Sequence, residues 1–576
     1  MAKKRPKAAR KPFAHEAARQ TLHSLLRSRN TKVGEADKFL EIISYLCSKY
    51  SVMGRYINTG NAGFQSSRNG EYVDKSGLIS IVNGTLFTER RFSCVTRCRR
   101  FGKSMAAKML NAYYDQSCDS RSLFADLQIA QDASFEQHLN KYPVIYLDLT
   151  TFTAEKEADI VNRMDGELLA DVSKVYADIP VEAGDRLITY LLRVVEVTGQ
   201  PFLFIIDEWD AICREYEPGT ETMDRYVGWL RRMFKSIDGM RVFAGVYMTG
   251  ILPIKKYKTE SALNNFQEYS MVTPRRMAGY FGFRKTEVKA LADKYGMDFD
   301  ELEKWYDGYQ IGNERSIFNP NSVMQAIDNG YCTSFWASTG AYDAVARYIQ
   351  MNYEGLKDDI IAMLAGGRCY VDPTGFQNDM SVVRSKDDVL TVLIHLGYLS
   401  YDWRANECYI PNREVAGEMV NAVKDTNWNH VAAALEQSRR LLQATLAGDE
   451  AAVARGVDAA HDEHTSILSY NDENSLACVL SLAYYYAGND YIVHRELATG
   501  KGFADLVLIP RKNVASPAIV VELKYHQAVD TAIAQIKRRE YPAKVAQYVG
   551  NLLLVGISYD RETKQHACRI EKYVSE

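Results

Sequence analysis

Four short apolar runs in the first half of the chain alternate with polar or helical segments. They are "FSCVT" (residues 92–96), "VIYLDL" (144–149), "FLFIIDE" (202–208) and "VFAGVYMTG" (242–250). Continuous apolar strands separated by helices are typical of a parallel sheet that is buried on both faces. The pattern therefore predicts an α/β domain with helices on both sides of its sheet.

The pattern changes further along the chain. Segments such as "KTEVKALADKYGM" and "SKDDVLTVLIHLGYLSYD" have the apolar spacing of helices, and an Ala-rich helical run follows them. The last hundred residues alternate between expected helices (473–487 and 529–545) and expected strands (491–498, 503–509, 517–525 and 551–559). We therefore expect five segments: a basic arm with a helical extension (1–55), a nucleotide-binding α/β domain (56–285), a mostly helical middle region (286–430), a helical connector (431–470) and a second α/β domain (471–576).

The composition of the chain argues against some classes of protein. The net charge of −3 argues against a chain that coats nucleic acid with its whole surface, although "MAKKRPKAARKP" at the start is strongly basic. That arm is either a solvated tail or a nucleic-acid or targeting segment. No run approaches the roughly 20 apolar residues of a membrane helix, so we expect a cytoplasmic protein with no membrane partner. The cysteines form no CxxC pair, and "HDEH" (461–464) is expected to be solvent-exposed rather than a metal site.

A phosphate-binding loop is indicated directly after the first apolar run. Gly102, Lys103 and Ser104 open a helical segment, which is where backbone N–H groups, a lysine and a magnesium-binding hydroxyl meet a nucleotide phosphate. Arg97 stands where the first glycine of the usual pattern belongs, so a chance tripeptide is the alternative. We include the preceding Arg99 and Arg100 among the expected nucleotide-binding residues.

The third and fourth apolar runs end in polar residues that could act together with this phosphate-binding loop. Asp207 and Glu208 close a buried strand, at the sheet edge where parallel sheets bind ligands. Asp207 is expected to hold Mg²⁺ and Glu208 to orient or activate the attacking water. Thr249 could report on the γ-phosphate of ATP. The alternatives are an acid pair that begins a solvated loop and a threonine that caps a strand.

A second constellation lies near the C-terminus. Asp505 occurs in one expected strand and Glu522 and Lys524 in the next, and alternation along a strand puts Glu522 and Lys524 on one face. Two carboxylates suit Mg²⁺, and a lysine can steer or deprotonate a water and offset phosphate charge. This composition is typical of a phosphodiester-cleaving site. A strand-surface salt bridge is the alternative.

These residues resemble bacterial AAA-ATPase-like proteins that carry a C-terminal PD-(D/E)XK nuclease domain. The resemblance rests on motifs in the family's order: "YVDKS" (72–76), "TRCRRFGKS" (96–104), "YPVIYLDL" (142–149), the acid pair 207–208, "MTGILPI" (248–254), "WYDGYQIG" (305–312), "FNPNSV" (318–323), "GYLSY" (397–401) and "IPNREV" (410–415). It implies that Arg97 belongs to the family's loop. Cys98 replaces a usual proline, and Gln310 a usual basic residue, which puts the role of that second loop in doubt.

The same resemblance implies a restriction-endonuclease-like fold for the tail. Ala504 stands where the motif name has proline, Glu473 matches an acid that completes the metal site, and Gln535 with Tyr541 matches a helical QxxxxxY feature. Asp505, Glu522 and Lys524 would then be the catalytic residues, with Glu473 as a further metal ligand.

We therefore expect an ATP- and Mg²⁺-binding module joined to a metal-dependent nuclease that acts on nucleic acid, with DNA as the expected substrate, in a chain that could assemble with itself. One alternative is a nucleotide-dependent switch or scaffold whose nuclease fold binds nucleic acid without cleaving it. Another is an ATPase that acts on a protein partner. Trp305 or Tyr306 could cap a nucleotide base, and Arg275 or Arg276 could sense phosphate, although core aromatics and exposed arginines are the commoner roles.

Overall fold

The computed structural model describes most of the chain from residue 53 onward. The described residues are 53–153, 159–216, 220–336 except 255, 258–259 and 262, 348–376 except 352 and 365, 383–424, 429–464, 484, 487, 491–498, 503–510, 516–538, 545 and 551–573. The basic arm, Glu473 with most of its expected helix, and Tyr541 lie outside them. Among the described residues, no helix combines the length and the apolar character needed to cross a membrane.

The first domain is built on a five-stranded sheet in the order β2-β3-β4-β1-β7, and every neighbouring pair is parallel. The strands are β1 (Phe92–Thr96), β2 (Val144–Asp148), β3 (Phe202–Asp207), β4 (Phe243–Gly250) and β7 (Gln267–Tyr269). The four apolar runs are thus confirmed as strands. β7 was not predicted, because three residues are too few to show a pattern.

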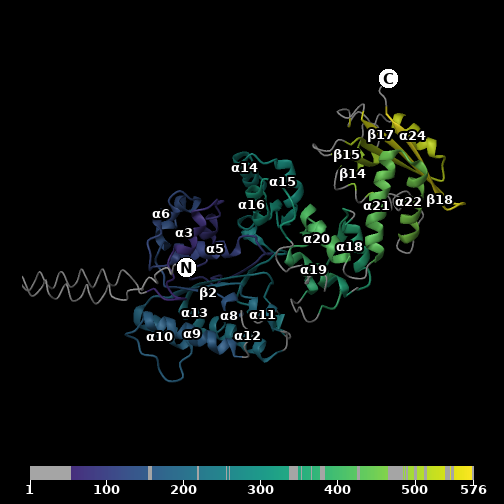
Figure 1. The fold of residues 1–576 in the computed structure, drawn as a ribbon. Helices are drawn as coiled ribbons and strands as arrows, with labels where there is room; N and C mark the ends of the chain where they lie inside the picture. Colours follow the sequence, from purple (N-terminus) through teal and green to yellow (C-terminus); the bar gives the residue numbers. More distant parts are fainter. Residues whose placement is uncertain are drawn as a thin grey trace, which may run out of the picture.

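Alternating side chains of each strand enter two separate cores. Phe204 and Ile206 of β3 face one core, and Leu203 and Ile205 face the other. Helices cover both faces (Figure 1), so the prediction of a sheet buried on both sides is confirmed. The helices are α3 (Ala62–Arg68), α4 (Gly77–Asn83), α5 (Lys103–Tyr114), α6 (Arg121–Phe124), η1 (Gln128–Gln131), α7 (Phe135–His138), α8 (Thr150–Thr153), α9 (Ile160–Val175), α10 (Leu187–Thr198), α11 (Ala211–Glu215), α12 (Glu221–Phe234), α13 (Ile237–Val242) and η2 (Arg275–Tyr280).

The middle region is mostly helical, and it also contains two small antiparallel sheets that the sequence did not lead us to expect, β8-β10-β9 and β11-β13-β12. Its elements are β8 (Phe283–Arg284), α14 (Lys285–Tyr295), α15 (Phe299–Tyr306), β9 (Tyr309–Ile311), β10 (Glu314–Phe318), α16 (Pro320–Asn329), α18 (Leu356–Leu364), β11 (Cys369–Tyr370), η4 (Pro373–Gly375), α19 (Lys386–Leu396), β12 (Ser400–Asp402), β13 (Glu407–Tyr409) and α20 (Arg413–Lys424). A short hairpin, β5 (Lys256–Tyr257) and β6 (Glu260–Ser261), precedes it.

The C-terminal domain is a second five-stranded sheet, β14-β15-β16-β17-β18, in which only the β16–β17 pair is parallel. Its strands are β14 (Tyr491–Ala498), β15 (Phe503–Pro510), β16 (Ala518–Tyr525), β17 (Leu552–Asp560) and β18 (Gln565–Lys572), and β18 was not predicted. Helix α24 (Val529–Arg538) covers one face. Helices α21 (Asn429–Ala447) and α22 (Glu450–His464) pack on the other face, so the predicted connector forms a layer of this domain rather than a free spacer.

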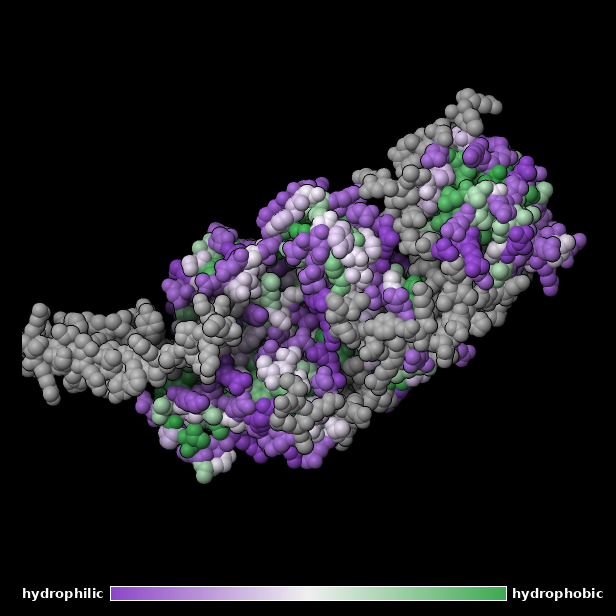
Figure 2. Space-filling model, viewed as in Figure 1, coloured by the Kyte–Doolittle hydropathy of each residue, from purple (hydrophilic) through white to green (hydrophobic). Residues whose placement is uncertain are grey.

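The expectation for "HDEH" is wrong for His461, which is buried against the rings of Tyr559 and His566. His566 Nδ1 in turn lies 2.7 Å from Asp458 Oδ1 on α22. These contacts fasten α22 to the sheet. The surface in Figure 2 is mainly hydrophilic, with separate hydrophobic groups over the first domain and over the C-terminal sheet.

The loop after β1 is embedded in protein on its inner side. Arg97 is fully buried and donates hydrogen bonds to the carbonyl oxygens of Thr96 (2.8 Å), Tyr269 (2.7 Å) and Met277 (3.3 Å). Burial lowers the pKa of Arg97 to about 10, so the guanidinium stays charged at neutral pH. Arg97 does not need the left-handed backbone that glycine favours, whereas Arg100 (φ 67°) and Gly102 (φ 87°) do adopt it. The absence of glycine at position 97 therefore does not argue against a phosphate-binding loop, because the left-handed backbone occurs at Arg100 and Gly102 instead.

Other residues of the same loop belong to the core of the middle region. Cys98 and Phe101 are buried in that core, and Phe101 meets the ring of Tyr309 edge-on at 5.1 Å. Gly397 approaches so closely that a Cβ there would lie 2.5 Å from Cys98 Cβ. The sequence motifs around Tyr309 and Gly397 therefore act as the support of the loop.

Arg100 joins the loop to Glu414 of α20 through the backbone of one residue, Phe335. Arg100 Nη1 donates to the Phe335 carbonyl oxygen (3.0 Å), and the Phe335 N–H donates to Glu414 Oε1 (2.8 Å). Ser322 Oγ donates to the same carboxyl group. Burial raises the pKa of Glu414 to about 7, against the opposing effects of these hydrogen bonds and of Arg100.

Replacing Arg97 by lysine should destabilise the first domain by about 2–4 kcal/mol, because an ammonium group cannot reproduce the fork that serves several buried carbonyls. Thermal melting measures this, with the exposed Arg90→Lys as the control. Equal melting temperatures for the Arg97→Lys and Arg90→Lys variants would contradict a supporting role.

The variant Glu414→Gln tests the buried carboxyl group. A pKa of about 7 in the native state means that the stabilising proton is fully held below the ordinary value of 4.5 and is lost as pH rises through 7. Wild type should therefore lose stability relative to Glu414→Gln between about pH 4.5 and 7, by at most about 3 kcal/mol, with no further loss above that range. Melting curves recorded across this range check it, with Glu354→Gln as the exposed control, and parallel pH profiles would refute it.

Candidate functional site

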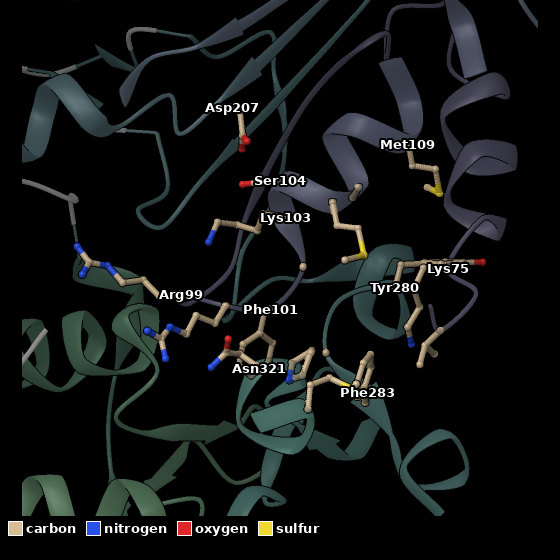
Figure 3. Close-up of a pocket in the computed structure, with 18 of the residues that line it drawn as sticks. Lys75, Arg99, Phe101, Lys103, Ser104, Met109, Asp207, Tyr280, Phe283 and Asn321 are labelled. Atoms are coloured by element: carbon tan, nitrogen blue, oxygen red, sulfur yellow. The ribbon is translucent and has the colours of Figure 1, made fainter. Parts of the chain in front are cut away.

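A cavity of about 770 Å³ lies at the carboxyl ends of the parallel strands. It is lined by the loop from Arg99 to Ala106, by the ends of β2 and β3, and by residues of the middle region (Figure 3). This volume lies within the range of small-molecule sites. The topology explains its place, because the carboxyl ends of parallel strands gather at one edge of the sheet.

The predicted phosphate-binding residues line this cavity together. Gly102 precedes α5, so the free backbone N–H groups of that helix start beside Lys103 and Ser104. Lys103 Nζ donates to the Cys98 carbonyl oxygen (3.1 Å) and lies 3.8 Å from Glu208 Oε1, and its side chain is only 4% exposed. Arg99 and Arg100 also line the cavity, although Arg100 makes its contact with Phe335 of the middle region.

Asp207, at the end of β3, lies in a network of hydroxyl groups. Thr249 Oγ1 of β4 donates to Asp207 Oδ1 and accepts a hydrogen bond from the Glu208 N–H (3.2 Å). Burial raises the pKa of Asp207, while hydrogen bonds from Thr249 and Ser104 oppose that rise. The Thr249 hydroxyl group therefore links the side chain of Asp207 to the backbone of Glu208. Ser104 and Asp207 offer adjacent oxygen ligands, the kind that Mg²⁺ prefers, so these residues fit that ion.

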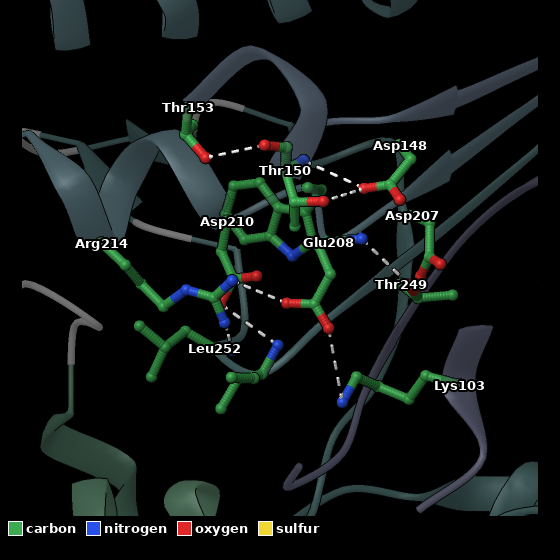
Figure 4. A network of polar contacts seen from close by, with 12 residues as sticks. Lys103, Asp148, Thr150, Thr153, Asp207, Glu208, Asp210, Arg214, Thr249 and Leu252 are labelled. Atoms are coloured by element: carbon green, nitrogen blue, oxygen red, sulfur yellow. Dashed lines mark hydrogen bonds and ion pairs between the residues drawn. The ribbon is translucent and has the colours of Figure 1, made fainter. Parts of the chain in front are cut away.

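Glu208 lies between two cations (Figure 4). Its backbone is left-handed (φ 55°), and its carboxylate accepts a hydrogen bond from Arg214 Nη2 at 2.6 Å while facing Lys103. Burial alone would raise the pKa of Glu208, but Lys103 and Arg214 outweigh burial and hold it below its usual value. The side chain is thus ionised at neutral pH, as a general base requires.

Sequence reasoning missed two residues of this site. Asp148 closes β2 directly beside Asp207 and accepts hydrogen bonds from Thr150, and the acid at the end of the second apolar run was a readable signal. Arg214 lies six residues after Glu208 on α11. Its role could not be read from the sequence, because only the fold of that short helix brings it back to the carboxylate.

The opposite end of the cavity is apolar and aromatic. Its lining includes Tyr72 and Val73 of the "YVDKS" motif, Tyr280, Phe283, and Met324 of α16. Lys75 of the same motif is turned to Glu287, with which it makes a 2.7 Å ion pair. Flat apolar walls of this kind suit a nucleotide base.

Other candidates lie away from this cavity. Tyr306 is buried and donates to the Thr333 carbonyl oxygen, and the Trp305 ring lies 4.4 Å from the Arg413 guanidinium carbon. Arg275 donates to Gln267 Oε1. Neither the two aromatic residues nor Arg275 and Arg276 occur among the described residues that line the cavity. Gln310 bonds to Asp402 (3.1 Å), which is a structural contact.

The C-terminal constellation also comes together. Lys524 Nζ donates to Glu522 Oε1 (3.0 Å), and the side-chain amide of Gln535 on α24 donates to the same oxygen. Asp505 Oδ2 accepts a hydrogen bond from the Leu523 N–H (2.7 Å), between these two residues. Glu522 and Lys524 are both buried. Asp505 therefore contacts the strand that carries Glu522 and Lys524, and a pocket shared by the three side chains stays a prediction.

Two acids are the described part of the expected metal site, because Glu473 is not described. Within the described portion of the chain, no group of three or more His, Cys, Asp or Glu side chains is arranged to hold a metal ion. Asp505 and Glu522 on neighbouring strands supply only oxygen ligands, which fits Mg²⁺ with water completing its shell.

Comparisons with known proteins find matches to two separate parts of the chain. Residues 62–259 match a family model described as a predicted AAA-ATPase, and residues 471–568 match a model of the PD-(D/E)XK nuclease superfamily. An uncharacterized protein in the vnfD 5' region of Azotobacter chroococcum mcd 1 is 24% identical over 278 residues, which are 47% of this chain. The match covers 50% of that protein, so the chain spans about half the length of this curated relative.

Two solved structures resemble parts of the chain at low TM-scores. The ORC2 protein of Aeropyrum pernix, in ADPNP and ADP complexes, is 12% identical, with a TM-score of 0.29 over 66% of this chain and 100% of that chain. AMPPCP-bound DnaA from Aquifex aeolicus is 9% identical, with a TM-score of 0.25 over 63% of this chain and 91% of that chain. The chain therefore joins a domain that matches the predicted AAA-ATPase model to a C-terminal domain that matches the model of the PD-(D/E)XK nuclease superfamily.

Proposed function

We propose that the chain binds and hydrolyses ATP and that its C-terminal domain is a Mg²⁺-dependent nuclease that cleaves phosphodiester bonds, with DNA as the substrate. One observation carries this proposal. Each domain gathers a lysine and oxygen ligands suited to a divalent ion at one place on its sheet: Lys103 with Ser104 and Asp207, and Lys524 with Asp505 and Glu522.

In the first domain, Lys103 and the N-terminus of α5 bind the phosphates, and the apolar end of the cavity takes the base. Ser104 and Asp207 would hold Mg²⁺, which neutralises phosphate charge when bound. Glu208 orients the attacking water and accepts its proton, because its carboxylate is ionised and faces the phosphate-binding residues.

In the C-terminal domain, Asp505 and Glu522 would hold the metal ion, which polarises the phosphate and its attacking water when bound. Gln535 fixes the Glu522 carboxylate. Lys524, within hydrogen-bond distance of Glu522, offsets charge on the phosphate under attack and assists removal of the water proton. The burial of Glu522 and Lys524 strengthens both effects.

A route for control of one site by the other supports this proposal. Arg100 of the loop and Glu414 of α20 both bond to the backbone of Phe335, α20 contacts α21, and α21 packs on the C-terminal sheet. Control also requires two states of this route that nucleotide stabilises differently. Nuclease assays with and without ATP, on wild type and Lys103→Ala, test it.

The variant Lys103→Ala should weaken ATP binding at least about tenfold, because the buried ammonium group that faces the phosphates is lost. The variant Glu208→Gln should bind ATP normally and hydrolyse it at least about 100-fold more slowly. Titration with a fluorescent ATP analogue and phosphate release measure these effects. Lys108→Ala, an exposed residue of the same helix, is the control, and equal binding by both lysine variants would exclude this cavity as the site.

The variants Glu522→Gln and Lys524→Ala should each reduce Mg²⁺-dependent cleavage at least about 100-fold, since the metal ligand or its charge partner is removed. Plasmid, linear duplex, single-stranded DNA and RNA are the substrates, and Glu562→Gln and Lys564→Ala in the exposed β17–β18 turn are the matched controls. Cleavage that survives both substitutions would place the activity elsewhere. Binding without any cleavage by wild type would favour the nucleotide-dependent scaffold.

A further inference from the structure

Arg214 is a charged residue of the cavity that none of the sequence motifs or family matches assigns. It lies on α11, its side chain is 19% exposed, and its Nη2 donates to Glu208 Oε2 at 2.6 Å (Figure 4). A hydrogen bond between two ionised groups at this distance is among the stronger polar contacts in proteins. Arg214 therefore fixes one oxygen of the carboxylate that we propose as the general base.

The arginine is itself fixed from the other side. Its Nη1 lies 3.8 Å from Asp210 Oδ2, and the fully buried Asp210 accepts hydrogen bonds from the Ile251 N–H (3.1 Å) and the Leu252 N–H (3.0 Å). These N–H groups follow directly after β4. Asp210 thus fixes the position of the guanidinium relative to the sheet, even though α11 is short.

Glu208 has a second cation, Lys103, but that contact is longer, at 3.8 Å. Lys103 is also the residue that phosphates would attract, since both its charge and its position at the start of α5 face them. A bound triphosphate competes with Glu208 for Lys103. Arg214 is then the cation that keeps Glu208 in place.

We propose that Arg214 is the positioning residue of the ATPase site: it holds the Glu208 carboxylate in the orientation that proton abstraction from water requires. This inference rests on the proposed ATP hydrolysis and assigns the residue on which the general base depends.

The contacts of Arg214 determine how its loss is detected. Its two ion pairs join it to the carboxylates of Glu208 and Asp210. Because Arg214 holds the proposed base, its loss should lower the turnover rate and leave ATP binding nearly intact. General loss of structure would lower both.

The experiment compares Arg214→Ala and Arg214→Lys with Arg225→Ala, an exposed arginine of α12 that pairs with Glu221 and Asp159. ATP binding and the kcat for phosphate release are measured for each variant. For Arg214→Ala we expect ATP binding within about threefold of wild type and kcat lowered at least about tenfold. Arg214→Lys should recover part of this loss, and Arg225→Ala should match wild type.

The double variant Glu208→Gln/Arg214→Ala provides the second measurement. If Arg214 acts through Glu208, the double variant is no slower than Glu208→Gln alone. An additive loss of rate in the double variant would overturn the inference, as would a parallel loss of ATP binding, which would show that Arg214 contacts the phosphates instead.

Failure of the proposed function is distinguishable from failure of this inference. If wild type binds ATP but releases no phosphate, the proposed hydrolysis is wrong. The pairing of Arg214 with Glu208 is then judged by a double-mutant cycle in melting temperature at pH 7.5, where additive effects of the two substitutions refute it and a coupling of the two supports it.

Discussion

The buried guanidinium of Arg97 is the constraint on which the rest of the first domain depends. A charged group without water must find hydrogen-bond acceptors, and Arg97 finds them in the carbonyls of three separate segments. It therefore fixes the positions of β7 and η2 relative to β1. Cys98 and Phe101 of the same loop lie in the core of the middle region, and the loop presents Gly102, Lys103 and Ser104 to the cavity.

At the polar end of the cavity, positively and negatively charged side chains alternate, and this arrangement stabilises them. Lys103, Glu208, Arg214 and Asp210 follow one another as cation, anion, cation and anion, and the last is anchored on backbone N–H groups. Each buried charge thus has an opposite neighbour, which offsets the cost of removing it from water. Asp207 is the exception, because hydroxyl groups rather than a cation surround it. A divalent cation bound there would supply the missing charge.

The C-terminal site also places a lysine beside a carboxylate, but its residues are positioned by different elements. Its residues come from two neighbouring strands and from α24, so their spacing is set by strand pairing and by the close packing of α24 on β17 at Gly556. The helices α21 and α22 close the other face of this sheet and continue the chain from α20. The two sites therefore share a covalent and packed path through the middle region, and the loop after β1 stands at its beginning.

The sequence by itself determined the strands with long apolar runs, the phosphate-binding tripeptide, and the acids at strand ends, because each is a local pattern of side chains. It did not reveal β7, β18 or the two small sheets, which are too short or too polar to show a period. It also suggested glycine-like freedom at Arg97, whereas tertiary packing makes that residue a buried anchor and places the left-handed turns at Arg100 and Gly102. The partnership of Arg214 with Glu208, the burial of His461 and the raised pKa of Glu414 were decided only by the tertiary structure. Each depends on which side chains from distant segments share one poorly hydrated space, and no local pattern encodes that.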